Sequence, residues 1–223
     1  MPTPMKAMIL AAGRGERMGP LTADRPKPLL KIGGSPLIEQ HVTRLARDGI
    51  REIVINLSYR GAQIRDHLGD GGRYGVAIAY SEEGEPPLET AGGIVHALPL
   101  LGAAPFLLVN SDVFTDFDYR TLAVGQSPTI VLVRNPEHNA RGDFGLDAAG
   151  RVRTEPRSYT YAGIAVLDPV LFAALEPGRR PLKPVLDAMI ARGELRGVRF
   201  EGLWIDVGTP ERLEAARAIA SRE

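Results

Sequence analysis

The chain has 223 residues, of which 44% are hydrophobic and 24% are charged. This composition is ordinary for a globular protein and excludes a collagen-like chain, a coiled coil and a wholly disordered chain. The 27 basic and 27 acidic side chains cancel, which argues against a dedicated DNA-binding or anionic-membrane protein, so we expect neither nucleic acid nor membrane as a partner.

Apolar blocks of strand length alternate with segments of helical periodicity in the first part of the chain. Four such blocks predict strands, at residues 7–12, 52–57, 76–80 and 105–110, because continuous apolar runs are typical of strands buried on both faces. Three helices are predicted between them, at residues 37–45, 62–68 and 90–101. The alternation predicts a mainly parallel sheet with helices on both faces.

The pattern changes after residue 118. The remaining chain predicts strands at residues 129–133 and 159–167, short strands around a turn at 148–150, an extended segment at 203–207, and helices at 182–191 and 211–220. These elements could complete the sheet and add a small antiparallel lid. Because no linker or repeat interrupts the sequence, we predict one Rossmann-like α/β domain over residues 1–223 with a mixed, mainly parallel sheet.

The loop after the first strand is a candidate phosphate site, because ligands of open parallel sheets bind beyond the carboxyl ends of the strands. Residues 13–19 (GRGERMG) combine glycines with arginines, although many glycine-rich loops only turn the chain. Their spacing matches neither the dinucleotide fingerprint nor the P-loop. Further on, Pro26 and Pro28 bracket Lys27 and disfavour a helix there. Lys27 is either a solvated surface lysine or a preset positive charge for a polyphosphate.

Two carboxylates occur where a charge is unexpected. Asp112 lies two residues past the apolar strand predicted at 105–110, and Asp206 interrupts the apolar segment LWIDVG. A buried carboxylate is costly unless a cation or a metal compensates it. Asp112 could cap a turn and Asp206 could be a structural acceptor; if the two instead converge beside a triphosphate, they would hold Mg²⁺.

Residues 9–30 (ILAAGRGERMGPLTADRPKPLL) resemble the signature of sugar-1-phosphate nucleotidyltransferases, LAAG-x-G-x-R-[ML]-x-P-LT-x(4)-PKPL. The resemblance continues through ETAGG, NSDV and WIDVGT. It implies the nucleotide-diphospho-sugar transferase fold, with a nucleotide-binding half to about residue 118 and a sugar-binding half at 119–223. The segments EGEPPLETAGGI and NPEHNARGDFGL, and a chain end soon after WIDVGTPERL, most resemble members that join N-acetylmuramate α-1-phosphate to UTP in bacterial cell-wall recycling.

The same resemblance implies the partners and the site. UTP and a sugar 1-phosphate would be the substrates, and Mg²⁺ the cofactor, held by Asp112 and Asp206. Arg17 and Lys27 would be catalytic. The expected nucleotide-binding residues are Ala11, Ala12, Gly13, Gly15, Arg17, Lys27, Gly92 and Asn110. The expected sugar-binding residues are Glu89, Asp143, Glu155 and Gly163. Ser111 and Ala162 depart from the residues common in the family, so the turn and sugar contact there are expected to differ.

Several other polar residues have structural interpretations. Thr90 is expected to cap the helix that follows it. Asp116 and Asp118 are expected in a solvated loop, with helix capping by Asp118 as the main alternative. His41 and His96 fall on apolar helical faces and are expected in the core or at its boundary. Glu83 and Glu85 are expected to be exposed, in a loop that could border the uracil.

Other functions were weighed against a uridylyltransferase. A mannose-1-phosphate guanylyltransferase or a glucose-1-phosphate thymidylyltransferase would share the opening signature. A sensor that only binds nucleotide sugars is expected to have lost one of the charged site residues, all of which are present: Arg17, Lys27, Asp112 and Asp206. A kinase or ATPase is disfavoured because the P-loop is missing.

The sequence also bears on location and assembly. It has no cysteine, which excludes disulfides and weakly favours a reducing compartment. Its apolar runs are much shorter than the roughly 20 residues that cross a bilayer, and residues 1–6 lack the basic start of a secretory signal. We therefore expect a cytoplasmic protein, and a monomer.

Overall fold

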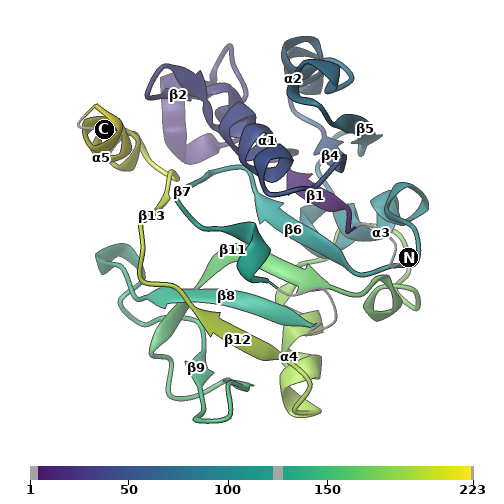
Figure 1. Ribbon diagram of the computed structural model, residues 1–223, viewed down its shortest axis with the longest axis vertical. Helices are drawn as coiled ribbons and strands as arrows, with labels where there is room; N and C mark the ends of the chain where they lie inside the picture. Colours follow the sequence, from purple (N-terminus) through teal and green to yellow (C-terminus); the bar gives the residue numbers. More distant parts are fainter. Residues whose placement is uncertain (1–4, 123–127, 222–223) are drawn as a thin grey trace.

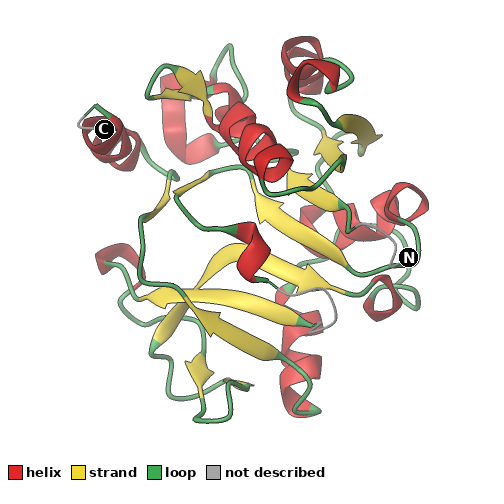
Figure 2. Cartoon of the chain, viewed as in Figure 1, coloured by secondary structure: helices red, strands yellow, loops and turns green. Residues whose placement is uncertain are grey.

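The computed structural model describes residues 5–122 and 128–221. Its centre is one seven-stranded sheet in the order β12-β8-β11-β6-β1-β4-β5 (Figures 1 and 2). The strands are β1 (Ala7–Leu10), β4 (Glu52–Leu57), β5 (Ala77–Glu82), β6 (Phe106–Asn110), β8 (Thr129–Arg134), β11 (Tyr159–Leu167) and β12 (Arg196–Arg199). Neighbouring strands pair in parallel except at β11, which is antiparallel to both β6 and β8. The predicted mixed, mainly parallel sheet is confirmed, and it joins strands from both halves of the chain.

Helices cover both faces of the sheet, as predicted. One face packs against α1 (Leu37–Arg47) and α2 (Gly61–Leu68), and the other against α3 (Glu89–Leu101) and α4 (Lys183–Ala191). Adjacent strand residues supply opposite faces, since successive side chains of a strand alternate. In β1, Ile9 belongs to the cluster with α1, and Met8 to the cluster with α3.

A third apolar cluster lies beyond the sheet and supports the loop after β1. It joins the 3₁₀ segment η1 (Glu16–Thr22) to α5 (Pro210–Ala220) and to the two-stranded antiparallel sheet of β7 (Val113–Thr115) and β13 (Trp204–Asp206). Met18, Val207 and Leu213 are each fully buried there. Arg17, beside Met18 in the sequence, is therefore carried on an anchored segment.

The remaining elements are short. Two more antiparallel pairs are β2 (Lys31–Ile32) with β3 (Ser35–Pro36) and β9 (Gly145–Leu146) with β10 (Val152–Arg153); the second is the hairpin expected around residues 148–150. Single 3₁₀ turns are η2 (Lys27–Leu29), η3 (Gly72–Tyr74), η4 (Tyr119–Thr121), η5 (Glu137–Asn139) and η6 (Pro169–Leu171). Within residues 5–122 and 128–221, no helix has the length and apolar content needed to cross a membrane.

Local details both confirm and correct the sequence predictions. Asp118 caps η4 by accepting a hydrogen bond from the Arg120 backbone N–H, which confirms the alternative considered for this residue. Thr90 does not cap α3, because the helix begins one residue earlier, at Glu89, and Leu88 precedes it. The edge strand β12 was not predicted, since its sequence RGVR is short and has a single apolar side chain.

The two histidines expected on apolar faces differ. His96 is exposed, and its Nε2 donates to the Glu82 carbonyl at 2.8 Å, so its assignment to the core was wrong. His41 is buried, with 3% of its surface exposed, and its Nδ1 lies 3.1 Å from the Tyr119 hydroxyl. Burial, with a smaller contribution from Arg44, lowers the pKa of His41 to about 4.

This shift predicts an acid-dependent loss of stability. In the unfolded chain the imidazole has a pKa near its ordinary value of about 6.5, so protons favour the unfolded state between that pH and about 4. Above about pH 6.5, His41 causes no loss of stability. Below that pH, protonation of the unfolded chain lowers the free energy of unfolding by roughly 1.4 kcal/mol per pH unit, a total loss of about 3 kcal/mol by the time the folded-state pKa is reached. Urea unfolding at pH 7 and pH 5 should show a smaller difference in His41→Gln than in the wild type. His96→Gln serves as the control, and an unchanged difference in His41→Gln would contradict the assignment.

Candidate active site

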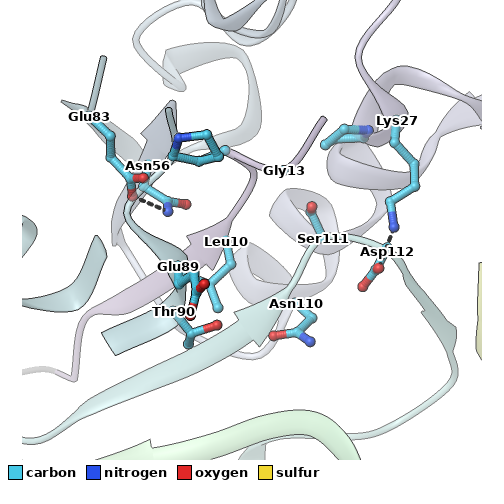
Figure 3. A pocket seen from close by; sticks show the side chains of 13 residues that line it. Leu10, Gly13, Lys27, Asn56, Glu83, Glu89, Thr90, Asn110, Ser111 and Asp112 are labelled. Atoms are coloured by element: carbon cyan, nitrogen blue, oxygen red, sulfur yellow. Dashed lines mark hydrogen bonds and ion pairs between the residues drawn. The ribbon is translucent and has the colours of Figure 1, made fainter. Parts of the chain in front are cut away.

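A cavity opens where β1, β4 and β6 end, at the carboxyl edge of the sheet (Figure 3). It encloses about 290 Å³ and is lined by Leu10, Ala12, Gly13, Lys27, Pro28, Asn56, Glu83, Pro87, Glu89, Thr90, Asn110, Ser111 and Asp112. Figure 3 shows Asn56 and Glu83 on one side, and Lys27 and Asp112 on the other. This is the position in which open parallel sheets bind their ligands, and the size suits a nucleoside.

A second cavity of about 700 Å³ adjoins the first, because Lys27 and Pro87 line both. Its charged lining consists of four basic side chains, Arg14, Arg17, Lys27 and Arg179, and two acidic ones, Glu16 and Glu85. A wall with an excess of fixed positive charge attracts and holds phosphates. The two cavities together therefore suit a nucleotide with a long anionic chain.

The phosphate-loop candidate is held in shape by close backbone contacts. Gly15 has φ = +67°, and a Cβ built on it would lie 3.0 Å from the Lys27 Cβ. The Thr22 hydroxyl lies 3.1 Å from the Gly15 carbonyl and 3.2 Å from the Gly19 carbonyl, closing the loop on itself. Glycine at position 15 thus lets the loop pack directly against the segment that carries Lys27.

Lys27 points into the site and pairs with Asp112. The lysine begins η2, so the prediction that proline on both sides would keep it out of a helix was wrong for this single 3₁₀ turn. Its side chain is only 12% exposed, and Nζ donates to Asp112 Oδ2. The solvated-surface interpretation of Lys27 is therefore excluded for this state of the protein, since the ammonium group stands buried in the wall of both cavities.

Asp206 lies among basic groups beside Gly208. Its Oδ2 is 3.1 Å from Arg212 Nη1 and 3.5 Å from His138 Nε2. Burial, and then the charge of Arg212, lower the pKa of His138, so the imidazole is neutral near pH 7. A Cβ on Gly208 would lie 2.3 Å from Arg212 Nη2 and 3.0 Å from both Arg17 Nη2 and Asp206 Oδ1. The missing side chain of Gly208 lets Arg212 pair with Asp206 and leaves space for Arg17 beside them.

Asp112 and Asp206 are neighbours across the β7–β13 pair. Asp206 stands opposite Val113, and the Val207 N–H donates to the Asp112 carbonyl at 2.8 Å. Asp206 Oδ1 is buried and has no hydrogen-bond partner within the described part of the chain. Two carboxylates with spare oxygens fit a hard divalent ion that keeps several waters. Across residues 5–122 and 128–221, no cluster of three or more His, Cys, Asp or Glu side chains forms a complete protein cage, which such an ion does not need.

A series of hydrogen bonds holds the wall of the first cavity in place. Asn56 Oδ1 accepts from the Ala11 N–H at 2.7 Å, and Asn56 Nδ2 donates to Glu83 Oε1 at 2.6 Å. Glu83 Oε2 in turn accepts from the Leu88 N–H at 2.8 Å. Glu83 is therefore half-buried and structural, and the expectation that it is simply exposed was wrong. The Ala11 N–H is therefore already engaged by the protein.

The predicted nucleotide residues fall into two groups. Those that line the cavities are Ala12, Gly13, Gly15, Arg17, Lys27 and Asn110. Ala11 and Gly92 are buried behind the walls, and a Cβ on Gly92 would lie 2.2 Å from the Gly178 carbonyl.

Of the predicted sugar residues, Glu89 lines the first cavity, and the other three lie outside both sets of lining residues. Asp143 accepts from Asn139 Nδ2 at 3.1 Å and from the Tyr161 N–H at 2.9 Å. Glu155 pairs with Arg157 at 2.9 Å. Gly163 has φ = +75°, and a Cβ there would lie 2.8 Å from the Asn110 side chain. Their roles toward a sugar stay predictions.

Sequence reasoning missed four side chains of the site: Asn56, His138, Arg179 and Arg212. Asn56 offered a signal, since it is a polar residue inside an apolar strand. His138 and Arg212 lie in segments that carry the family resemblance, NPEHNARGDFGL and WIDVGTPERL, which could have drawn attention to them. Arg179 lies in a segment of ordinary surface composition, and no local pattern marks it.

The chain is similar to known proteins over nearly its whole length. Residues 6–222 match the nucleotidyl transferase family. The chain is 49% identical to N-acetylmuramate alpha-1-phosphate uridylyltransferase of Neisseria meningitidis serogroup B, over 97% of this chain and 98% of that protein. It is 35% identical to the protein of the same name from Caulobacter vibrioides, over 96% of both chains.

The fold is also similar to a solved structure. A crystal structure of a Bacillus anthracis protein, described as a glucose-1-phosphate thymidylyltransferase in complex with a sucrose, superposes with a TM-score of 0.87. The alignment covers 97% of this chain and 95% of that one at 24% identity. At this identity the likeness establishes the architecture and leaves the substrate to other arguments.

The contacts around Gly208 predict a sensitive position. Gly208→Ala should displace Arg212, Arg17 or Asp206, because its Cβ would lie 2.3–3.0 Å from all three; a displacement of about 1 Å costs on the order of 10²-fold in turnover. Steady-state turnover measures the effect, and thermal unfolding checks that the variant folds. Gly72→Ala is the control, because Gly72 lies outside both cavities and its Cβ would stand 3.2 Å from Asp70 Oδ1. Equal turnover in the two variants would contradict the convergence at Gly208.

Proposed function

The chain belongs to the nucleotidyl transferase family, and on that premise we propose that it joins N-acetylmuramate α-1-phosphate to UTP, giving UDP-N-acetylmuramate and pyrophosphate. The 49% identity to a uridylyltransferase over nearly the full length supports this reaction. The observation that carries the proposal is the buried ammonium group of Lys27, which lies where a nucleoside-sized cavity meets a basic one.

The nucleotide is assigned to the two cavities according to its chemistry. The uracil and ribose occupy the first cavity, near Ala12, Gly13 and Asn110. The triphosphate extends past Lys27 into the second, where Arg17 faces the β- and γ-phosphates. This placement matches charge with charge and puts the α-phosphate beside Lys27.

The reaction is an in-line substitution at the α-phosphorus. An oxygen of the sugar phosphate forms a new bond to the α-phosphorus, and the bond from that phosphorus to the bridging oxygen of the β-phosphate breaks, so pyrophosphate leaves with the electron pair. The nucleophile is already an anion at neutral pH, and no general base is needed. The barrier lies in bringing two polyanions together and stabilising the charge on the α-phosphate.

The chain's own charges lower this barrier. Lys27 bridges the α-phosphate and the sugar phosphate, and Arg17 holds the departing pyrophosphate. Asp112 and Asp206 are the residues that would hold Mg²⁺, which when bound neutralises phosphate charge and orients the reacting oxygens. Glu89, beside the first cavity, is placed to accept hydrogen bonds from sugar hydroxyls.

The proposed substrates also indicate a cellular location. UTP and an activated amino-sugar acid are intracellular metabolites, so we place the enzyme in the cytoplasm, in the recycling of cell-wall sugars. We also propose a monomer as the working unit.

A substrate matrix tests the proposed reaction. Pyrophosphate release should be greatest with UTP and N-acetylmuramate α-1-phosphate, among four nucleoside triphosphates and the 1-phosphates of N-acetylmuramate, glucose, N-acetylglucosamine and mannose. It should stop with EDTA and return with Mg²⁺. A preference for GTP with the mannose ester, or for thymidine triphosphate with the glucose ester, would replace the proposed substrates. Binding without turnover would make the protein a sensor, and phosphate release in place of pyrophosphate would indicate a kinase or ATPase.

Substitution of Lys27 tests the mechanism most directly. Lys27→Ala should lower turnover by about 10²-fold or more, as for other preorganised charge contacts. Lys31→Ala, which removes an exposed lysine four positions away, should leave turnover within about a factor of two of wild type, the spread expected for a surface position. A folded Lys27→Ala protein with near-normal turnover would refute the role of this residue.

A further inference from the structure

A loop from the second half of the chain is fixed against the start of α3. The Arg180 N–H donates to the Leu88 carbonyl at 2.9 Å, and the Arg180 carbonyl accepts from the N–H groups of Ala91 and Gly92 at 3.0 and 3.1 Å. Gly92 permits this approach, since a Cβ there would lie 2.2 Å from the Gly178 carbonyl. The backbone on both sides of Arg179 is thereby held beside the cavities.

The Arg179 side chain is held as well. Its Nε lies 2.8 Å from Glu89 Oε1. Glu89 has φ = +61°, a left-handed conformation that is costly for a residue with a Cβ and that tends to occur at functional sites. Arg179 lines the second cavity and Glu89 lines the first, so this ion pair stands at the boundary between them.

The guanidinium of Arg179 retains binding capacity. Glu89 lies against the Nε, and within the described residues neither Nη group donates a hydrogen bond. A guanidinium has five N–H donors in a planar fork that matches a carboxylate. Arg179 is also 65% exposed along its side chain, which leaves room for a ligand to approach.

The other basic groups of the second cavity have different surroundings. Lys27 pairs with Asp112, and Arg17 Nη2 lies beside Gly208, 3.0 Å from where a Cβ would stand. Arg14 stacks on the Tyr59 ring, with its guanidinium carbon 5.0 Å from the ring centroid. The proposed phosphate chemistry uses neither Arg14 nor Arg179. Of these two, Arg14 already stacks on an aromatic ring, whereas Arg179 stands at the boundary between the cavities.

We propose that Arg179 binds the carboxylate of an acidic sugar 1-phosphate, and that Glu89 positions its guanidinium for that contact. The inference rests on the proposed function, because N-acetylmuramate differs from N-acetylglucosamine by a lactyl ether that ends in a carboxylate. The substrate then carries two anionic groups: the phosphate faces Lys27, and the carboxylate faces Arg179. A sugar 1-phosphate whose sugar carries no carboxylate leaves Arg179 without a ligand.

The test compares two substrates in several variants. Arg179→Gln should lower kcat/KM for N-acetylmuramate α-1-phosphate by about 10- to 100-fold, the range for a hydrogen bond to a charged group. The same variant should change kcat/KM for N-acetylglucosamine α-1-phosphate by less than about threefold, because that ester offers no carboxylate. The KM for UTP should not move. Arg179→Lys should recover part of the loss, and Glu89→Gln should fall between Arg179→Gln and wild type.

Arg180→Gln is the matched control. It removes the same charge one residue away, where the side chain donates to the Glu176 carbonyl at 2.6 Å and lies outside the lining of both cavities. It should keep the wild-type ratio of the two substrates, and thermal unfolding should be similar in all variants.

The outcomes separate the two levels of the proposal. An equal loss with both sugar phosphates, a raised KM for UTP, or an unchanged ratio in Arg179→Gln would overturn the role of Arg179 while the wild-type reaction stands. If the wild-type protein turned over a sugar 1-phosphate without a carboxylate and not N-acetylmuramate α-1-phosphate, the proposed function would be wrong. The proposed carboxylate contact would then be wrong as well.

Discussion

The site depends on charge balance at one edge of the sheet. Two carboxylates and several basic side chains are gathered where burial makes an isolated charge cost several kcal/mol. Without substrates, each carboxylate is compensated by a cation: Asp112 by Lys27 and Asp206 by Arg212. Polyanionic substrates need those same cations. In the proposed reaction, substrate binding would exchange one set of ion pairs for another, and the carboxylate oxygens that it frees would be hard donors of the kind that a divalent ion prefers.

This exchange requires the charged groups to be close before the substrates arrive, and glycines make that possible. Gly15 lets the loop contact the base of Lys27, and Gly208 leaves space for Arg17, Arg212 and Asp206 around one point. The chain tolerates the entropic cost of these glycines, about 1 kcal/mol each relative to alanine, because a Cβ would separate the charges. Preorganisation of this kind lowers the barrier more than added contacts would.

Much of the fold could be predicted because its pattern is local. Continuous apolar runs marked β1, β4 and β6, and helical periodicity marked α1 and α3. The signature around Lys27 also pointed to the candidate phosphate loop, whose Gly15, Arg17 and Lys27 line the second cavity. The pairing of β12 with β8 could not be predicted, since RGVR has no strand pattern of its own and its place is set by its neighbours.

The same distinction applies to the site. Recognisable segments contain Arg17, Lys27, Asp112 and Asp206. Arg179 instead enters through a contact between residues far apart in the sequence, and Arg212, only six residues after Asp206, enters through the way its helix packs. Arg179 meets Glu89 because the loop around it docks on α3, and Arg212 reaches Asp206 because α5 packs against η1 and β13. Such contacts depend on tertiary packing, which hydrophobic periodicity does not encode.

The two halves of the chain are tied together around the site. β11 pairs with β6 inside the sheet, β13 pairs with β7 beyond it, and the Trp204 indole N–H donates to the Ala162 carbonyl at 2.9 Å. The Arg180 backbone adds a further link, to Leu88 and Ala91. A substrate that contacts both halves therefore meets groups whose spacing the fold has already fixed. Little of its binding energy is needed to order them, so more remains to bring two polyanions into line.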